Sequence, residues 1–258
     1  MDIWQTSTDN WSQLCTALGC AKVSVRGALV HTFPIRRSGS FYNSVFVQHP
    51  QAFGIEDAEQ VFSEGQLPFS IVLPRLASFG ELGKSLEKKG YSLAPPWTLM
   101  VHEKSIGSSS LDVKVMEIDS SKLRDWFQLQ DAFAHVESSR PARLNMVKKV
   151  LEQKEAHLLL ADLQGRSVGA GLLFIKDGIA SIHMIATLAQ FRKRGVATTV
   201  TLEAIRRAME FKSRLVWLRT RRGGIGEKVY RQLGFTIFSD ILSYTKTPEC
   251  EDSNLPPQ

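Results

Sequence analysis

The sequence has few cysteines and no long apolar run, and each lack narrows the classes of protein to consider. Its three cysteines, Cys15, Cys20 and Cys250, follow no metal-ligand spacing and leave an odd thiol, so reduced thiols and no metal site are expected. The longest apolar runs have the length of strands, so no membrane-spanning helix is expected. Residues 1–6 lack the basic region and apolar core of a secretory signal. These features predict a cytoplasmic protein that does not enter membranes.

An excess of charge is also missing from the first part of the chain. Basic and acidic residues balance over residues 1–110, so the whole formal excess of +6 lies in 111–258. Ten basic residues fall between Arg192 and Arg222, against only Glu203 and Glu210. Such a field attracts anionic ligands, and it suits either a polyphosphate cofactor or a nucleic acid.

The length of 258 residues, with 43% hydrophobic side chains, suits one large domain or two ordinary ones. The run Gly107–Ser110 is the best candidate for a linker. We therefore expect an N-terminal domain over 1–106, a linker over 107–111, a second domain over 112–247 and a disordered acidic tail over 248–258.

The second domain has the pattern of an α+β fold, in which helices cover a mixed sheet. Gln164-Gly165 and Asp177-Gly178 are expected to form hairpin turns between strands. The order is two helices, three strands, helix, strand, helix and strand. The predicted elements are 123–133, 143–155, 157–163, 168–175, 179–188, 196–211, 214–220, 226–233 and 235–245.

The N-terminal half contains a weaker copy of the end of this pattern, with a strand at 69–74, a helix at 79–89 and a strand at 97–101. Gly90 and Gly234 each follow a predicted helix, where the left-handed conformation suits glycine. This similarity predicts an internal repeat, although the same order is common in unrelated α/β proteins.

The segment Arg192-Lys-Arg-Gly195-Val-Ala197 lies between a predicted strand and a predicted helix. The free N–H groups and positive dipole end of a helix start attract an anion, and glycine lets the backbone approach it. By itself this pattern is weak, because a basic helix start that binds nothing would look the same.

Two segments resemble motifs of the GNAT acetyltransferase superfamily. Residues 187–197 are similar to motif A, whose pattern is Arg/Gln-x-x-Gly-x-Gly/Ala between the fourth strand and the third helix. Residues 229–235, Val-Tyr-Arg-Gln-Leu-Gly-Phe, are similar to the end of motif B. The resemblance implies the GNAT acyl-CoA N-acyltransferase fold for 112–247. Together with the internal repeat, it implies a GNAT-like copy before this domain. That copy is expected to be degenerate and without a cofactor, since the nearest basic cluster, Arg36-Arg37-Ser-Gly39, has no helix predicted after it.

The resemblance implies acetyl-CoA as the co-substrate, with no metal. In the family the fourth strand splays from the fifth, and the pantetheine arm pairs with the backbone of the fourth strand, here Ile185, Ala186 and Thr187. The pyrophosphate would rest on the following turn, where Thr198 either binds a phosphate oxygen or caps the helix. The residues that would hold it are Arg192, Lys193, Arg194, Gly195, Val196, Ala197 and Thr198.

The resemblance also implies direct acetyl transfer to an amine. Tyr230 occupies the place of the family's thiolate-protonating tyrosine, although core packing is the alternative. His183 matches a histidine that helps to deprotonate the amine in arylalkylamine acetyltransferases, and a structural histidine is the alternative. Strand alternation predicts one common face for His183, Ile185 and Thr187.

Other candidate positions are weaker. His135 and Glu137 lie where the family often forms the wall of the acceptor site. Gly223–Gly226 stands where the family often has an asparagine, and this departure weakens the expected cofactor contacts. The run Arg219–Gly224 superficially resembles an RNA-binding segment, but it is interpreted as a basic loop.

The acceptor is predicted only as an amine, in a small molecule, an amino acid or a protein, and no oligomeric state is predicted. The alternative is a non-catalytic acyl-CoA sensor or interaction module. A nucleic-acid-binding protein is disfavoured, because residues 192–222 are not expected to expose interleaved aromatic side chains.

Overall fold

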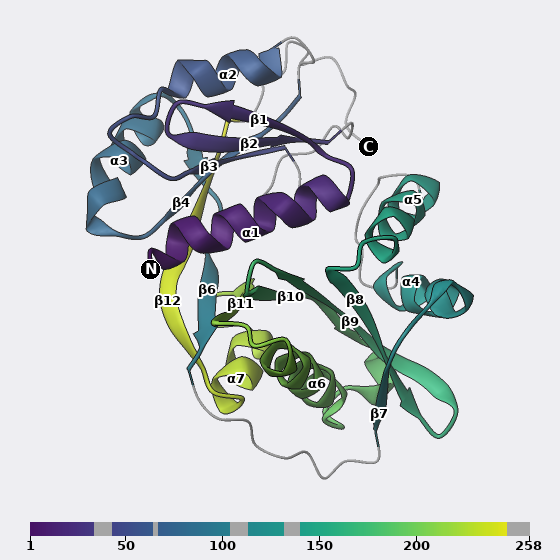
Figure 1. Cartoon of the computed structure of the whole chain (residues 1–258). Coiled ribbons are helices and arrows are strands. Elements are labelled where there is room, and N and C mark those ends of the chain that lie inside the picture. Colours follow the sequence, from purple (N-terminus) through teal and green to yellow (C-terminus); the bar gives the residue numbers. More distant parts are fainter. Residues whose placement is uncertain (34–42, 64–66, 104–112, 132–139, 247–258) are drawn as a thin grey trace, which may run out of the picture. The chain divides into compact units, whose positions relative to one another are not determined.

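The computed structural model describes residues 1–33, 43–63, 67–103, 113–131 and 140–246. The chain divides into two compact units (Figure 1). Unit 1 comprises Met1–Ala21 and Trp97–Asp240, and unit 2 comprises Lys22–Pro96 and Ile241–Gln258. Each unit contains strands of a mixed sheet together with helices, which confirms the predicted α+β class.

Unit 1 has the strand order β12-β6-β11-β10-β9-β8-β7. Its helices α6 and α7 lie on one face of these strands, and α1, α4 and α5 lie on the other (Figure 1). The strands are β6 (Trp97–His102), β7 (Lys114–Glu117), β8 (Ala156–Leu163), β9 (Arg166–Lys176), β10 (Ile179–Thr187), β11 (Leu215–Arg221) and β12 (Phe235–Thr245), the last of which runs on into unit 2. The helices are α1 (Ile3–Ala17), α4 (Leu123–Asp131), α5 (Arg140–Leu151), α6 (Val196–Glu210) and α7 (Ile225–Gln232), with short 3-10 helices at Ser120–Lys122 and Ala189–Phe191.

All nine elements predicted for the second domain are present, and most of their ends agree within two residues. Both hairpin turns form as predicted, with positive φ at Gln164 (54°), Gly165 (80°), Asp177 (52°) and Gly178 (72°). The predicted order was incomplete, because β7 precedes the two helices. This four-residue strand is mostly exposed and therefore shows little apolar alternation.

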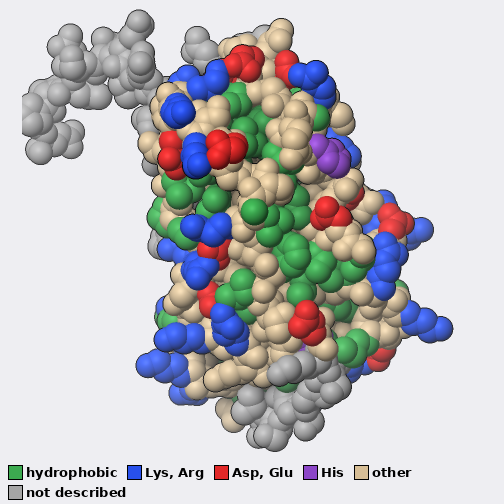
Figure 2. Space-filling model, turned by 90° about the vertical axis from the view of Figure 1, so that its left-hand side faces the viewer, with side chains coloured by type: hydrophobic (Ala, Val, Ile, Leu, Met, Phe, Trp, Pro, Cys, Tyr) green, Lys and Arg blue, Asp and Glu red, His purple; other side chains and the backbone are tan. Residues whose placement is uncertain are grey.

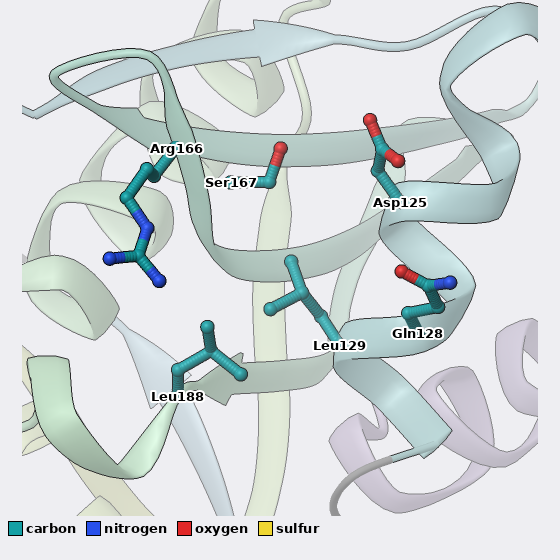
Figure 3. A pocket seen from close by; sticks show the side chains of 6 residues that line it. All are labelled: Asp125, Gln128, Leu129, Arg166, Ser167 and Leu188. Carbon is teal, nitrogen blue, oxygen red and sulfur yellow. The ribbon is translucent and has the colours of Figure 1, made fainter.

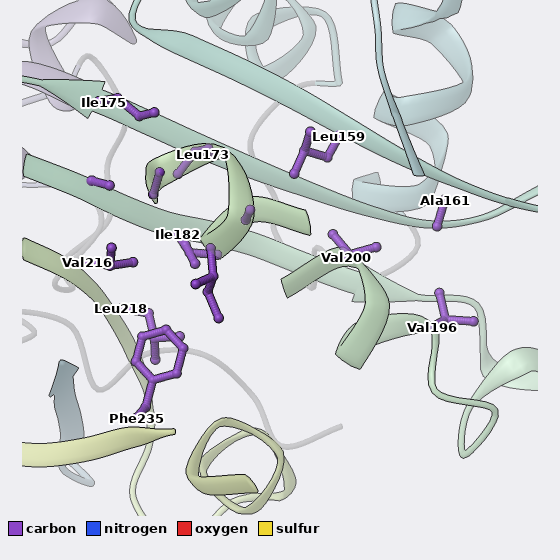
Figure 4. Close-up of a cluster of buried hydrophobic side chains, with 14 of the residues drawn as sticks. Leu159, Ala161, Leu173, Ile175, Ile182, Val196, Val200, Val216, Leu218 and Phe235 are labelled. Carbon is purple, nitrogen blue, oxygen red and sulfur yellow. The ribbon is translucent and has the colours of Figure 1, made fainter. Parts of the chain in front are cut away.

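Two glycines of β9 let α6 pack closely against the sheet. A Cβ atom on Gly169 would lie 2.4 Å from Cγ1 of Val196, and one on Gly171 would lie 2.8 Å from Cγ1 of Val200. Val196 and Val200 are buried in the core beneath α6 (Figure 4). The start of α6 is thereby fixed at a short distance from the strands.

We expect Gly169→Ala to destabilise unit 1 by about 1–3 kcal/mol, because the added methyl group must displace Val196 or the carbonyl of Ala186, 3.1 Å away. Gly80→Ala is the control, since no atom lies within 4 Å of its Cβ position and Gly80 has helical φ. Urea denaturation would measure both variants. Equal stability of Gly169→Ala and the wild type would contradict this account of the packing.

Unit 2 has the strand order β1-β2-β3-β4-β12. In it β2 and β3 are antiparallel, β3 and β4 are parallel, and β4 and β12 are antiparallel. Unit 1 repeats this pattern with β9, β10, β11 and β6. The strands are β1 (Ala21–Val25), β2 (Ala28–Thr32), β3 (Ser44–Val47), β4 (Ser70–Pro74) and β5 (Ser92–Leu93), and the helices are α2 (Ile55–Ser63), α3 (Gly80–Lys88) and a 3-10 helix at Ala77–Phe79.

The compact units do not follow the expected boundary at 107–111, which lies outside the described residues together with the tail. Strand β6 precedes that boundary but pairs with β11 in unit 1, whereas residues 241–245 of β12 follow it but pair with β4 in unit 2. Helix α1 also packs against β10 of unit 1. Strand β6 from the first half of the sequence thus belongs to unit 1, and the end of β12 from the second half belongs to unit 2. Local patterns do not encode such long-range pairing.

The glycines that follow helices adopt the expected conformation, with φ of 83° at Gly90 and 90° at Gly234. Helix α1 ends in the same way at Gly19, where the N–H of Cys20 donates to the carbonyl of Cys15 at 3.0 Å. Both thiols are buried, and burial raises the pKa of Cys15. We therefore interpret them as apolar side chains that close the end of α1.

Candidate active site

Strands β10 and β11 separate at one point in the sheet of unit 1. Their last parallel pair joins Ile182 to Leu218, although β10 continues to Thr187 and β11 continues to Arg221. On its other side, β10 remains paired with β9 as far as Thr187. The edge of β10 after Ile182 is therefore left without a strand partner on the side of β11.

A bulge lies where the two strands separate. The pairing of β10 with β9 shifts between His183 and Ala186, and Met184 has φ of 55°. The bulge turns the side chain of Ile185 toward α6, whereas His183 points to the opposite face. The prediction that His183 and Ile185 share a face was wrong, because an extra residue in a strand reverses the alternation of its side chains.

The turn between β10 and α6 is shaped to expose backbone N–H groups. Lys193 and Gly195 have φ of 62° and 73°, and Gly195 is the N-cap of α6. No side chain caps this helix start, and Thr198 lies inside the first turn rather than at the cap. The first N–H groups of α6 thus remain available to an anion.

The side chains of this turn divide into a buried part and a basic exposed part. Val196 is buried in the core, whereas Arg192, Lys193 and Arg194 are exposed. The guanidinium of Arg194 lies 5.6 Å from the ring centre of Phe191. Arg166 of β9 lies 5.3 Å from the same ring, so the fold brings a further cation to the turn. Sequence reasoning missed Arg166, because its distance along the chain hides the contact.

Arg166 also lines a pocket of about 320 Å³ between the start of β9, the end of β10 and α4. Figure 3 shows Arg166 and Leu188 across the pocket from Asp125 and Gln128 of α4. The volume is sufficient for a small ligand. Neither His183 nor Tyr230 lines it, so we do not place the chemistry there.

Tyr230 belongs to α7, on the same face of the sheet as α6. Its ring is half-buried, packs against the core and lies 6.0 Å from the ring of Phe235. Burial raises the pKa of Tyr230 to about 12. The phenol therefore keeps its proton over the whole neutral and mildly alkaline range, as a proton donor must.

Helix α7 begins at the glycine-rich segment that replaces the family's asparagine. Gly224 is its N-cap, and Glu227 accepts a hydrogen bond of 2.7 Å from the N–H of Gly223. Ile225 is 84% exposed. A carboxylate of the chain thus occupies this helix start, which indicates that α7 does not bind an anion there.

His183 is buried on the face opposite α6. Its ring centre lies 5.2 Å from that of Trp11 in α1 and 5.4 Å from that of Trp217 in β11. Burial, aided by the charge of Arg219, lowers the pKa of His183 well below its ordinary value. Among the described residues, its Nε2 atom has no hydrogen-bond partner. The imidazole is therefore neutral and has a nitrogen that could accept a proton, but its lowered pKa makes it a weaker base than an exposed histidine.

This buried histidine should make stability depend on pH. In the unfolded chain His183 binds a proton near pH 6.5, whereas in the folded state it does so only at a lower pH. Stability is therefore fully present above about pH 6.5 and falls by up to about 1.4 kcal/mol per pH unit below it. Urea denaturation over a range of pH should show a weaker fall for His183→Gln than for the wild type. Identical pH dependence in His183→Gln and wild type would contradict the neutral, buried state.

The remaining predictions concern residues outside the described part of the chain or residues that the structure places differently. His135 and Glu137 lie outside the described residues. Arg219 does not belong to a loop as predicted, because β11 extends to Arg221 and carries the Arg219 side chain against Trp11. Over the described part of the chain, no three His, Cys, Asp or Glu side chains form a group that could hold a metal ion. Within the same part, no helix is both long and apolar enough to cross a membrane.

Comparison with known proteins shows which family the chain resembles. Residues 121–235 match the model of the acetyltransferase (GNAT) family. A GCN5-related N-acetyltransferase from Kribbella flavida has a TM-score of 0.72 at 16% identity, covering 95% of this chain and 96% of its own. One from Sphaerobacter thermophilus has a TM-score of 0.66 at 17% identity, covering 86% and 80%.

A tandem GNAT protein from the clavulanic acid biosynthesis pathway has a TM-score of 0.58 at 11% identity, covering 84% of this chain and 78% of its own. At such identities the likeness establishes the fold alone, here the GNAT fold in a tandem arrangement. No curated protein matches the sequence significantly. The family match over residues 121–235 and the similar solved structures therefore agree that this part of the chain resembles the acetyltransferase (GNAT) family.

Proposed function

We propose that this protein is an acetyl-CoA-dependent N-acetyltransferase that transfers the acetyl group directly to an amine. The observation that carries the proposal is the separation of β10 from β11 next to a left-handed glycine turn at the start of α6. The free edge of β10 offers backbone groups of Ile185, Ala186 and Thr187 to the pantetheine amides. The turn from Arg192 to Thr198 offers N–H groups and exposed cations to the pyrophosphate.

Acetyl-CoA supplies the acetyl group as a thioester. One residue of the chain would accept a proton and another would donate one, and the two lie on opposite faces of the sheet. His183, which is neutral, accepts a proton from the acceptor amine. Tyr230, which is protonated, donates a proton to the departing thiolate. Because the strands separate beside His183, an acetyl group held in this gap would lie within reach of both faces.

The alternative is a non-catalytic acyl-CoA sensor, which the glycine-rich segment in place of the asparagine allows. Such a protein binds acetyl-CoA but acetylates no amine. Nucleic-acid binding has less support. On the face shown in Figure 2, basic side chains are interspersed with acidic and apolar ones and form no continuous stripe.

We expect calorimetric titration to find one acetyl-CoA site per chain, not two. In unit 2 the helix that connects parallel strands is α2, whose first turn carries Glu56 and Asp57. The Asp57 carboxylate lies 2.8 Å from the Cβ position of Gly54, directly before the helix. Negative charge at a helix start stabilises the helix and repels phosphate.

An assay of thioester cleavage against a panel of amines would follow this titration. A stoichiometry of one with amine-dependent cleavage supports the enzyme, and binding without cleavage supports the sensor. Two sites per chain would show that the acidic start of α2 does not prevent binding. No binding at all would overturn the proposed function.

A further inference from the structure

One cation packs against aromatic rings on the face of the unit 1 sheet opposite α6. The guanidinium carbon of Arg219 lies 4.1 Å from the ring centre of Trp11 and 5.9 Å from that of Trp217. These two rings are also the neighbours of His183. We call Trp11, His183, Trp217 and Arg219 the aromatic–arginine cluster. It combines residues from α1, β10 and β11.

The cluster lies where β10 and β11 separate. Leu218 makes the last pair with β10, and Arg219 is the next residue of β11. His183 is the corresponding residue of β10, because it directly follows Ile182, the partner of Leu218. Arg219 is partly exposed, whereas the three rings are buried. A ligand that approaches His183 from solvent would therefore meet the guanidinium of Arg219.

The chemistry of a desolvated guanidinium favours one kind of ligand. Burial lowers the pKa of Arg219 to about 10, which reflects the cost of removing its charge from water. A carboxylate that binds there regains electrostatic energy and matches the planar fork of the side chain. A second positive charge is repelled. The cation–π contact with Trp11 restrains the position of the guanidinium.

We propose that the aromatic–arginine cluster selects an acceptor whose amine lies next to a carboxylate, as in an α-amino acid. The inference rests on the proposed function and specifies its acceptor. Arg219 is the specificity residue that binds the carboxylate, and the amine is thereby placed at His183. Polyamines and other polycationic acceptors are disfavoured by the same charge.

The test compares ligands that differ only in the carboxylate. The complex of the protein with CoA, which carries no acetyl group, is titrated with phenylalanine and phenethylamine, and with alanine and ethylamine. We expect the amino acid of at least one pair to bind about tenfold to about hundredfold more tightly, because a charge-assisted hydrogen bond contributes about 1.5–3 kcal/mol. Equal binding within each pair, or no binding by any of the four, would overturn the inference.

Variants then assign the preference to Arg219. Arg219→Gln should abolish it, and Arg219→Lys, which keeps the charge, should retain part of it. Arg221→Gln is the matched control, because Arg221 is exposed on the same strand and its loss changes the net charge equally. If Arg219→Gln does not fold, Arg219→Lys alone tests the proposal. An unchanged preference of Arg219→Lys for the carboxylate-bearing ligand would show that the planar guanidinium does not recognise the carboxylate.

The two proposals fail in different ways. Wild-type protein that binds CoA and acetylates amines without regard to a carboxylate contradicts only the acceptor class. Protein that does not bind CoA contradicts the proposed function itself. A KM effect of Arg219→Gln confined to carboxylate-bearing acceptors would separate substrate recognition from a merely structural contact with Trp11.

Discussion

Gly195→Glu should abolish acetyl-CoA binding while leaving the fold intact. Gly195 has φ of 73°, which a residue with a side chain adopts at a cost of about 1–3 kcal/mol. The new carboxylate would also stand at the start of α6, where the phosphates are proposed to bind, and like charges placed together cost several kcal/mol. The expected loss of affinity is therefore at least about hundredfold. Calorimetry would measure it, with circular dichroism to verify folding.

Gly90→Glu is the matched control for this substitution. Gly90 also has a left-handed φ, of 83°, and no atom lies within 4 Å of its Cβ position. It ends α3 in unit 2, far along the chain from the phosphate turn. This variant should show a similar loss of stability but normal affinity. Gly195→Ala adds strain without charge, and it should weaken binding less than Gly195→Glu. If Gly195→Glu binds acetyl-CoA as tightly as the wild type, the turn before α6 is not part of the cofactor site.

Tyr230→Phe should lower kcat by about 10² to about 10⁴-fold, the usual effect of removing a general acid. The substitution keeps the ring that packs near Phe235, so acetyl-CoA affinity should be unchanged. The wild-type enzyme should also show no alkaline loss of kcat from this group until the pH approaches about 12, where the phenol titrates. Steady-state kinetics over a range of pH would measure both effects.

Tyr91→Phe removes the same atom from a tyrosine in unit 2. Tyr91 donates a hydrogen bond of 2.9 Å to Glu59, so this change should reduce stability and leave kcat unaltered. If Tyr230→Phe turns over at the wild-type rate, Tyr230 is a packing residue and the proton must come from elsewhere. This result would leave the acetyl-CoA site itself untouched, because Gly195→Glu tests it separately.

The sequence predicted the glycine turn before α6 well because every feature of that turn is local. A strand, three cations, a glycine and a helix follow one another within a few residues, and Gly195 adopts the left-handed conformation that the pattern requires. The hairpin turns at Gln164-Gly165 and Asp177-Gly178 were predictable for the same reason. Tyr230 and His183 were found through a resemblance of motifs, and their catalytic roles remain predictions.

Other parts of the site had no local signal. Met184 is not a glycine, so nothing in the sequence marks its positive φ or the bulge that turns Ile185 away from His183. Arg219 looked like part of a basic loop, and its contact with Trp11 joins residues from opposite ends of the chain. Such contacts depend on strand register and helix placement, which short patterns do not contain.

The sequence by itself thus determined most helices and strands, the turns between them and the position of the glycine turn before α6, because local periodicity and glycine specify these features. The tertiary structure alone decided that β6 pairs in unit 1, that the end of β12 pairs in unit 2, and that α1 lies against His183. A strand edge can pair with any strand whose backbone groups match its own hydrogen bonds. Whether β6 or β12 pairs with a strand from its own half of the sequence or from the other half therefore depends on the packing of the whole chain.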